Sequence, residues 1–106
     1  MKATNGIELT FYIGRYEDMF KRIAVITFEK ADGTWYDDVT INLPQYSLDE
    51  EDNEDAFLND SPEIIDAMVK DGYLEIIREC KTIFGTYQVG HFTEKFMKEF
   101  GKGDEE

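Results

Sequence analysis

Hydrophobic and polar side chains alternate along much of the chain up to residue 43, with the two-residue period of strands that bury one face. The pattern predicts strands over about residues 6–13, 21–29 and 34–43. Asp32-Gly33 separates the second from the third and is typical of a hairpin turn, because glycine adopts positive φ without strain. Gly14 is expected to end the first strand, and Pro44 the third, since proline cannot donate to a ladder.

Residues 46–60 show neither a helical nor a strand period and carry many carboxylates. We expect an exposed loop with one helical turn around residues 56–58, because carboxylates at this density could not all be paired in a core. Ser61-Pro62-Glu63 then supplies an N-cap, a first-turn proline and an acid at the positive end of a helix. That helix is predicted from Pro62 to about residue 71, with Gly72 as its stop.

The last third of the chain predicts more strands and a second helix. Residues 73–80 fit either a helix or a strand, and the glycine stop before them favours a strand. Residues 82–92 alternate as a strand does, and Gly85 and Gly90 are expected to mark bulges. Residues 93–100 begin with a capping threonine and predict a helix.

A chain of 106 residues is long enough for one small domain and too short for two. The fold class that these elements predict is α+β, an antiparallel sheet of four to five strands with two helices. The domain is expected to cover residues 1–101, and residues 102–106 to form a disordered acidic tail.

Charge is distributed unevenly along the chain. There are 24 Asp and Glu against 11 Lys and Arg, a net charge of −13 at pH 7. Residues 31–69 hold half of these acids and no Lys or Arg, so that the remaining segments are together nearly neutral. Like charges in one segment repel each other, and solubility alone could be achieved with an even distribution. The segregation therefore points to a function for the acidic segment.

The composition disfavours several classes of function. Nucleic acids and anionic membranes carry the same sign of charge as this chain, so direct binding to either is not expected. No stretch approaches the roughly 20 apolar residues of a membrane span, and the first ten residues lack the pattern of a signal peptide. The single cysteine cannot form an internal disulfide, which suits a reducing cytoplasm, the expected location.

Candidate catalytic and metal-binding residues are few. His91 has no Ser or Cys that the sequence places beside it, and we expect a partly exposed strand histidine. Cys80 lacks the neighbours of a zinc or redox site and is expected to be a small buried hydrophobe. The acidic run that starts at Asp49 has Glu54 and Asp60 where a calcium loop needs Gly and Glu. We therefore expect no enzyme, no metal and no cofactor.

The acidic run is the strongest candidate for a functional surface. If residues 49–55 are extended at about 3.3 Å per residue, their six carboxylates are spaced about as closely as the phosphates along one DNA strand, roughly 3.4 Å apart. Such a surface fits a groove that binds nucleic acid, although a solvated loop that adds only solubility is the alternative. Of the interleaved aromatic residues, Tyr36 and Tyr46 are expected in the interface, and Trp35 and Phe57 in the core. The predicted partner-binding carboxylates are Asp37, Asp38, Asp49, Glu50, Glu51, Asp52, Glu54, Asp55 and Asp60.

Four stretches carry a resemblance to a family: residues 23–33, Asp38-Val39-Thr40-Ile41-Asn42-Leu43-Pro44, Asp55-Ala56-Phe57-Leu58-Asn59-Asp60, and Gly85-Thr86-Tyr87 with Phe92. Over about residues 20–93 the chain resembles the short proteins of unknown function carried on conjugative and other mobile elements of gut bacteria. The family has no established activity to transfer. What the resemblance implies is a mobile-element setting, in which small acidic proteins that disable restriction or CRISPR nucleases are common.

These observations predict a non-enzymatic inhibitor of a bacterial defence nuclease, of the anti-CRISPR or antirestriction type. Its acidic, DNA-mimicking surface would fill the nucleic-acid channel of a basic partner, a CRISPR effector or restriction nuclease. A second hypothesis is an accessory protein-protein interaction module of a mobile element, without DNA mimicry. A third, a small metal-assisted hydrolase, stays open because clustered acids do not exclude it. The oligomeric state is not predicted.

Overall fold

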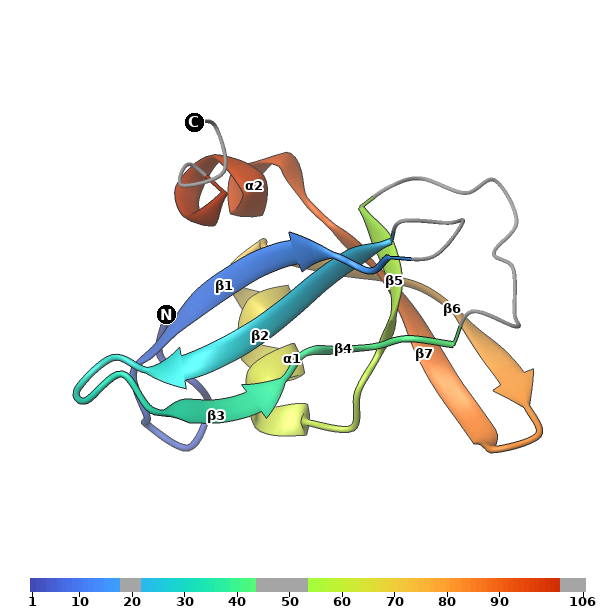
Figure 1. The fold of residues 1–106 in the computed structure, drawn as a ribbon, viewed down its shortest axis with the longest axis horizontal. Helices are drawn as coiled ribbons and strands as arrows, with labels where there is room; N and C mark the ends of the chain where they lie inside the picture. Colours follow the sequence, from blue (N-terminus) through green and yellow to red (C-terminus); the bar gives the residue numbers. More distant parts are fainter. Residues whose placement is uncertain (18–21, 44–53, 102–106) are drawn as a thin grey trace.

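The structure, a computed structural model, describes residues 1–17, 22–43 and 54–101. Within these ranges, two antiparallel sheets and two helices form the fold (Figure 1). The first sheet has the order β1-β2-β3, from strands Leu9–Arg15, Ile23–Glu29 and Trp35–Asp38. The second has the order β4-β5-β7-β6, from strands Thr40–Ile41, Asp55–Leu58, Gly85–Phe92 and Leu74–Thr82. The expected α+β class is confirmed, and the strands are divided between sheets of three and four.

The β2-β3 hairpin is confirmed where the sequence predicted it. Gly33 has a φ of 74°, and both the backbone N–H and the hydroxyl of Thr34 donate to Asp32 Oδ1. The strand expected over residues 34–43 is split, however, because β3 pairs with β2 whereas β4 pairs with β5 in the other sheet. The chain changes sheets at Val39, which is fully buried. Gly14 does not end β1, which continues to Arg15.

β5 is the largest departure from the sequence prediction. The helical turn expected around residues 56–58 is wrong: Asp55–Leu58 forms a strand whose four residues are all buried. Both faces of β5 are covered, since side chains of successive residues point to opposite faces and all four are buried, and so no alternation appears in its sequence; in the sheet it lies between β4 and β7. Pro44, Tyr46 and residues 49–53 lie outside the described residues, as does the tail 102–106.

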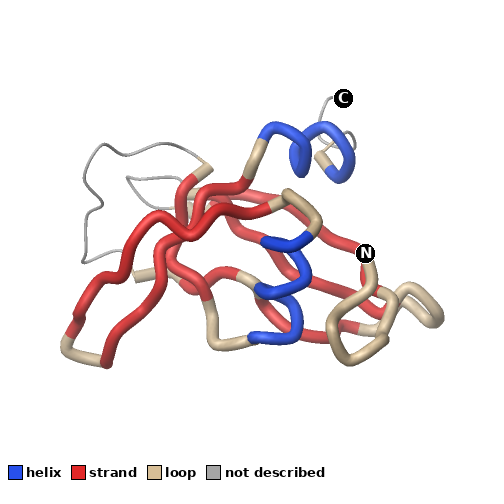
Figure 2. The backbone as a smooth tube through the Cα atoms, turned by 180° about the vertical axis from the view of Figure 1, so that it is seen from behind, coloured by secondary structure: helices blue, strands red, loops and turns tan. Residues whose placement is uncertain are grey.

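The two helices begin and end close to their predicted positions. α1 spans Pro62–Lys70, and Gly72 follows with a φ of 83°. α2 spans Glu94–Phe100, and the side chain of Thr93 accepts a hydrogen bond from the Phe96 N–H at its start. Figure 2 shows α1 lying against the strands from behind and α2 at one end of the molecule.

Strand β6 resolves the ambiguous stretch at residues 73–80. It runs antiparallel to β7, and the irregularity in this pairing lies between the pairs Ile76–Gly90 and Arg78–Val89, so the bulge expected at Gly90 is found beside it and the one expected at Gly85 is not. Gly85 closes the β6-β7 turn, with a φ of 129°. Gly90 lies under packed side chains, since a Cβ there would stand 2.9 Å from Leu58 Cδ1.

One hydrophobic core joins both sheets and both helices. β1, β2, β5, α1 and α2 all contribute to it, and its centre contains Val25, Ile64, Met68 and Phe96, each essentially inaccessible. Phe11 meets Phe96 edge to face, with ring centroids 5.2 Å apart. In the described residues no helix is long and apolar enough to cross a membrane.

A smaller cluster in the second sheet contains Leu43, Phe57 and Val89. The prediction that Phe57 is a core residue is confirmed. The same prediction for Trp35 is wrong, because 57% of that residue is exposed. Cys80 packs at the edge of the smaller cluster and is half-buried rather than fully buried.

Candidate functional site

The fold separates the predicted partner-binding carboxylates into two groups. Asp37, Asp38 and Asp60 lie around the start of α1, at the end of β3 and in the β5-α1 connection. Glu54 and Asp55 lie at the start of β5. The remaining predicted residues lie outside the described ranges: Tyr46, Asp49, Glu50, Glu51 and Asp52.

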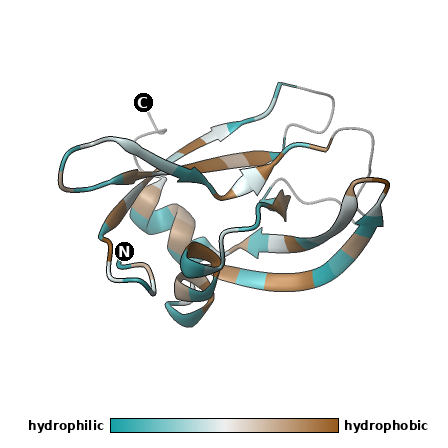
Figure 3. Cartoon of the chain, turned by 90° about the horizontal axis from the view of Figure 1, so that it is seen from below, coloured by the Kyte–Doolittle hydropathy of each residue, from teal (hydrophilic) through white to brown (hydrophobic). Residues whose placement is uncertain are grey.

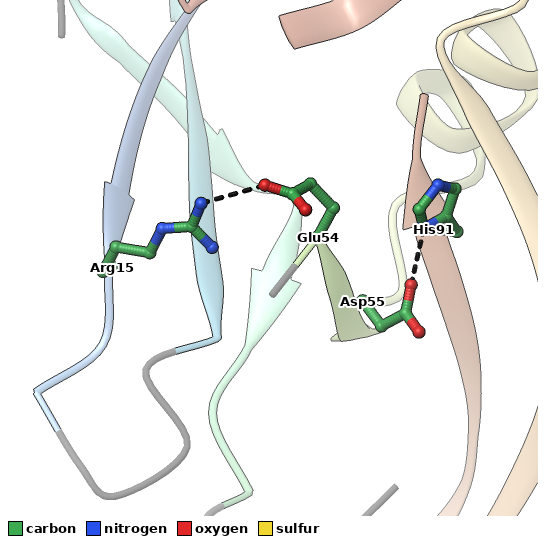
Figure 4. Close-up of polar contacts among 4 residues, drawn as sticks. All are labelled: Arg15, Glu54, Asp55 and His91. Atoms are coloured by element: carbon green, nitrogen blue, oxygen red, sulfur yellow. Dashed lines mark hydrogen bonds and ion pairs between the residues drawn. The ribbon is translucent and has the colours of Figure 1, made fainter. Parts of the chain in front are cut away.

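The group at β5 is paired with bases from neighbouring strands (Figure 4). Glu54 Oε2 lies 3.0 Å from Nη2 of Arg15 on β1. Asp55 Oδ1 lies 2.7 Å from Nδ1 of His91, which is its cross-strand neighbour on β7. The side chain of Asp55 is only 10% exposed. The expectation of an exposed loop is therefore wrong for Asp55, whose carboxylate is held inside the fold.

Among the described residues, the Asp55–His91 pair is the arrangement that most resembles part of a catalytic site. His91 is a partly exposed strand residue, as expected, with a side-chain exposure of 32%. A carboxylate on Nδ1 orients an imidazole as it does in catalytic triads, but the triad chemistry also needs a nucleophile on the other nitrogen. Among the described residues, the hydrogen bond that the His91 imidazole forms is the one to Asp55. The pair thus provides an oriented imidazole and no hydroxyl or thiol for it to activate.

Among the described residues, no three His, Cys, Asp or Glu side chains lie close enough together to hold a metal ion.

The group around α1 forms what we call the acidic face: Asp37, Asp38, Asp60, Glu63 and Asp66. Hydrogen bonds between side chains connect β3 to the start of α1. Ser61 Oγ donates to Asp37 Oδ2 on β3 at 2.5 Å. The side chain of this predicted N-cap residue accepts no hydrogen bond from the backbone of the helix. The Tyr36 hydroxyl donates to Glu63 Oε2 at 2.9 Å. These contacts hold two of the five carboxylates, those of Asp37 and Glu63, in place on β3 and α1.

No residue of the acidic face forms an ion pair with any other described residue. Asp60 and Asp66 are exposed, and the other three are partly exposed. The positive end of the α1 dipole favours acids here, but one dipole end carries only about half a charge against five carboxylates. The acidic face is thus a negative surface whose charge the described residues leave largely uncompensated.

The pKa of the Tyr36 phenol is affected by the negative charge of this surface. The hydrogen bond that Asn5 donates to its oxygen lowers the phenol pKa. The hydrogen bond to Glu63, desolvation, and the charges of Glu63 and Asp37 raise it, and the resulting pKa lies above the ordinary value. Tyr36 is half-buried and hydrogen-bonded on both sides, so its main contribution is to position Glu63.

Exposed aromatic side chains border the acidic face on two sides. On one side Trp35, itself exposed, donates its indole N–H to Asp38 Oδ1 at 3.1 Å. On the other an open hollow of about 500 Å³ separates Asp60 and Asp66 from the β6-β7 turn, where Phe84 is 59% exposed. Aromatic side chains of this kind are typical anchors of protein-protein contacts.

The sequence analysis did not identify Glu63 and Asp66 as members of this surface, nor Trp35 and Phe84 as the exposed aromatic residues beside it. The signal for the two acids was present, because Glu63 and Asp66 are three apart on a predicted helix and so share a face. Trp35 followed a strand pattern that suggested burial, and only the short, edge position of β3 leaves it exposed.

Comparison of the chain with protein-family models, with curated proteins and with solved structures finds no significant match.

Proposed function

We propose that this protein is a non-enzymatic binding protein whose acidic face occupies the basic, nucleic-acid-binding groove of a partner protein. The observation that carries the proposal is the set of five carboxylates on β3, the β5-α1 connection and α1, which has no counter-charge among the described residues. A groove lined with Lys and Arg supplies that counter-charge, as it does for phosphates.

Rigidity supports this function. The contacts of Asp37 with Ser61, and of Glu63 with Tyr36, fix two of the five carboxylates before a partner arrives. A partner then loses little free energy in ordering them, which favours affinity.

The proposed partner class is a bacterial defence nuclease, and the proposed effect is inhibition by exclusion of nucleic acid from its channel. A chain with a net charge of −13 is attracted to such a channel from a distance, which raises the association rate at low salt. Binding should weaken as salt rises, with a slope smaller than that of DNA itself, because a folded protein condenses fewer counterions.

The test uses affinity capture from bacterial lysates with matched variants. The acidic-face variant combines Asp38→Asn, Asp60→Asn and Asp66→Asn, and spares Asp37 because of its contact with Ser61. The control combines Glu17→Gln, Glu75→Gln and Glu94→Gln, three exposed acids outside the face. Each variant loses three negative charges, so the two have the same net charge.

The expected result is a basic nucleic-acid-binding protein that the wild type and the control retain and the acidic-face variant loses. Equal retention by all three proteins would contradict the acidic face as the binding surface. Capture of a partner that binds no nucleic acid, with the same dependence on the acidic face, would instead support the interaction module without DNA mimicry. A further variant, Trp35→Ala, should also weaken capture, because the side chain is an exposed aromatic anchor.

A further inference from the structure

Strand β6 is an outer strand of the four-stranded sheet as far as the described residues form it. Figures 1 and 2 show the β6-β7 hairpin projecting beyond the other strands, and Figure 3 shows hydrophobic and hydrophilic segments alternating along β6 before a hydrophobic turn. β6 spans nine residues; Ile77 in the strand is 51% exposed, and Ile83 in the turn that follows it is 85% exposed. A long outer strand with exposed apolar residues is a template for pairing with another strand.

The backbone register identifies which residues offer their hydrogen-bonding groups at this edge. Thr82 pairs with Gly85 across a two-residue turn, and such a closing pair exchanges both of its hydrogen bonds. Because hydrogen-bonded and non-hydrogen-bonded pairs alternate along an antiparallel ladder, Cys80 and Arg78 also bond to β7. The N–H and C=O groups of Lys81 and Glu79 therefore point to the outside.

From this pattern we infer that β6 pairs antiparallel with β6 of a second copy of this chain, about a two-fold axis at Cys80. This register sets Glu79 of one copy opposite Lys81 of the other, twice, and these are the residues whose backbone groups face outward. Beyond these pairs, the exposed Ile77, which lies at the irregularity of β6, comes opposite Ile83 in the β6-β7 turn of the other copy. The two four-stranded sheets then form one continuous sheet.

Charge complementarity selects a second copy in this register over other arrangements. Centring the axis on Glu79 or on Lys81 would place like charges directly opposite each other, which is destabilising. A two-fold axis that passes between two neighbouring residues of β6 would place residues whose N–H and C=O groups face outward opposite residues whose groups bond to β7, so that the two β6 strands could not form a regular ladder. Lysine on an outer strand normally discourages pairing with unrelated strands. Here Lys81 has a carboxylate opposite it only when the partner strand carries an acid at the matching position, as β6 itself does.

The experiment measures association of the full chain by sedimentation equilibrium, in about 0.15 M salt to screen repulsion between the two acidic copies. Edge-to-edge contacts are small, so protein concentrations extend to about 1 mM. Glu79→Lys sets two lysines opposite each other, twice, and should weaken dimerisation about tenfold or more. The double variant Glu79→Lys/Lys81→Glu restores opposite charges and should restore dimerisation. Glu94→Lys, which makes the same change in net charge on α2, is the control.

A second measurement tests the register. Opposed residues of a non-hydrogen-bonded pair have Cα atoms about 4.5 Å apart, within disulfide range. Mild oxidation with diamide, which takes up the two electrons and two protons released by the thiols, should link two wild-type chains through Cys80 and fail to link Glu79→Lys at the same concentration. A wild-type chain that stays monomeric at the highest concentration, or a dimer that Glu79→Lys leaves intact, would overturn the inference.

Discussion

Replacing Asp55 with alanine should destabilise the fold and leave partner binding unchanged, because this carboxylate serves a contact inside the protein. Its Oδ1 lies 2.7 Å from His91 Nδ1, and the Asp55 side chain is 10% exposed. Hydrogen bonds to a charged group contribute about 1.5–3 kcal/mol. Since 32% of the His91 side chain is exposed, solvent weakens the pair, and a coupling of about 1–2 kcal/mol is expected.

A double-mutant cycle measures this coupling directly. Asp55→Ala, His91→Ala and the double variant are unfolded in urea, and the coupling is the amount by which the double loss falls short of the sum of the single losses. In a domain of this size 1 kcal/mol lowers Tm by about 4–8 °C, so Asp55→Ala should lower Tm by at least this amount. A coupling below about 0.5 kcal/mol would refute a structural role for the pair. Loss of partner binding in a stable Asp55→Ala protein would refute the division of the carboxylates into two groups.

Two further predictions concern packing and pH. Gly90→Ala should cost about 1–3 kcal/mol in urea unfolding, because its Cβ would stand 2.9 Å from a methyl carbon of both Leu58 and Leu74, and unchanged stability would contradict the close packing there. Burial, together with the hydrogen bond to Glu99 and nearby acidic charges, raises the pKa of Tyr73 to about 12. Because the unfolded pKa is near 10, this group favours folding below pH 10, and its contribution is lost as pH rises from 10 to 12. Tyr73→Phe should therefore flatten the fall of the unfolding free energy over that range and remove the latest phase of tyrosinate absorbance, and an unaltered titration would contradict the assignment.

Local signals predicted the parts of the fold that depend on a few adjacent residues. The turn at Gly33, the start of α1 at Pro62 and the cap at Thr93 were each indicated by residues that act through their own backbone neighbourhood. β5 was missed because a four-residue interior strand is buried on both faces and has no period, so its position is decided by β4 and β7. The sheet change at Val39 was missed for a different reason, because the alternation continues across it and gives no sign that the strand is split.

The site was predictable in composition and only partly in geometry. The absence of Lys and Arg over residues 31–69 marked the segment that supplies the acidic face. The sequence could not separate Asp55 from Asp60, because the partner of Asp55 is 36 positions away at His91. Likewise, Ser61 was recognised as an N-cap, but its contact with Asp37 arises only when β3 is placed beside α1.

The measurement that tests the central claim most directly is displacement of labelled nucleic acid from the captured partner. Fluorescence anisotropy follows the labelled strand as the protein is added, and in the reverse order nucleic acid is added to a preformed protein complex. The proposal predicts mutual exclusion in both orders, with the variant Asp38→Asn/Asp60→Asn/Asp66→Asn unable to compete and the Glu17→Gln/Glu75→Gln/Glu94→Gln control competing as the wild type does. A stable ternary complex of partner, nucleic acid and this protein would contradict occupation of the groove by the acidic face.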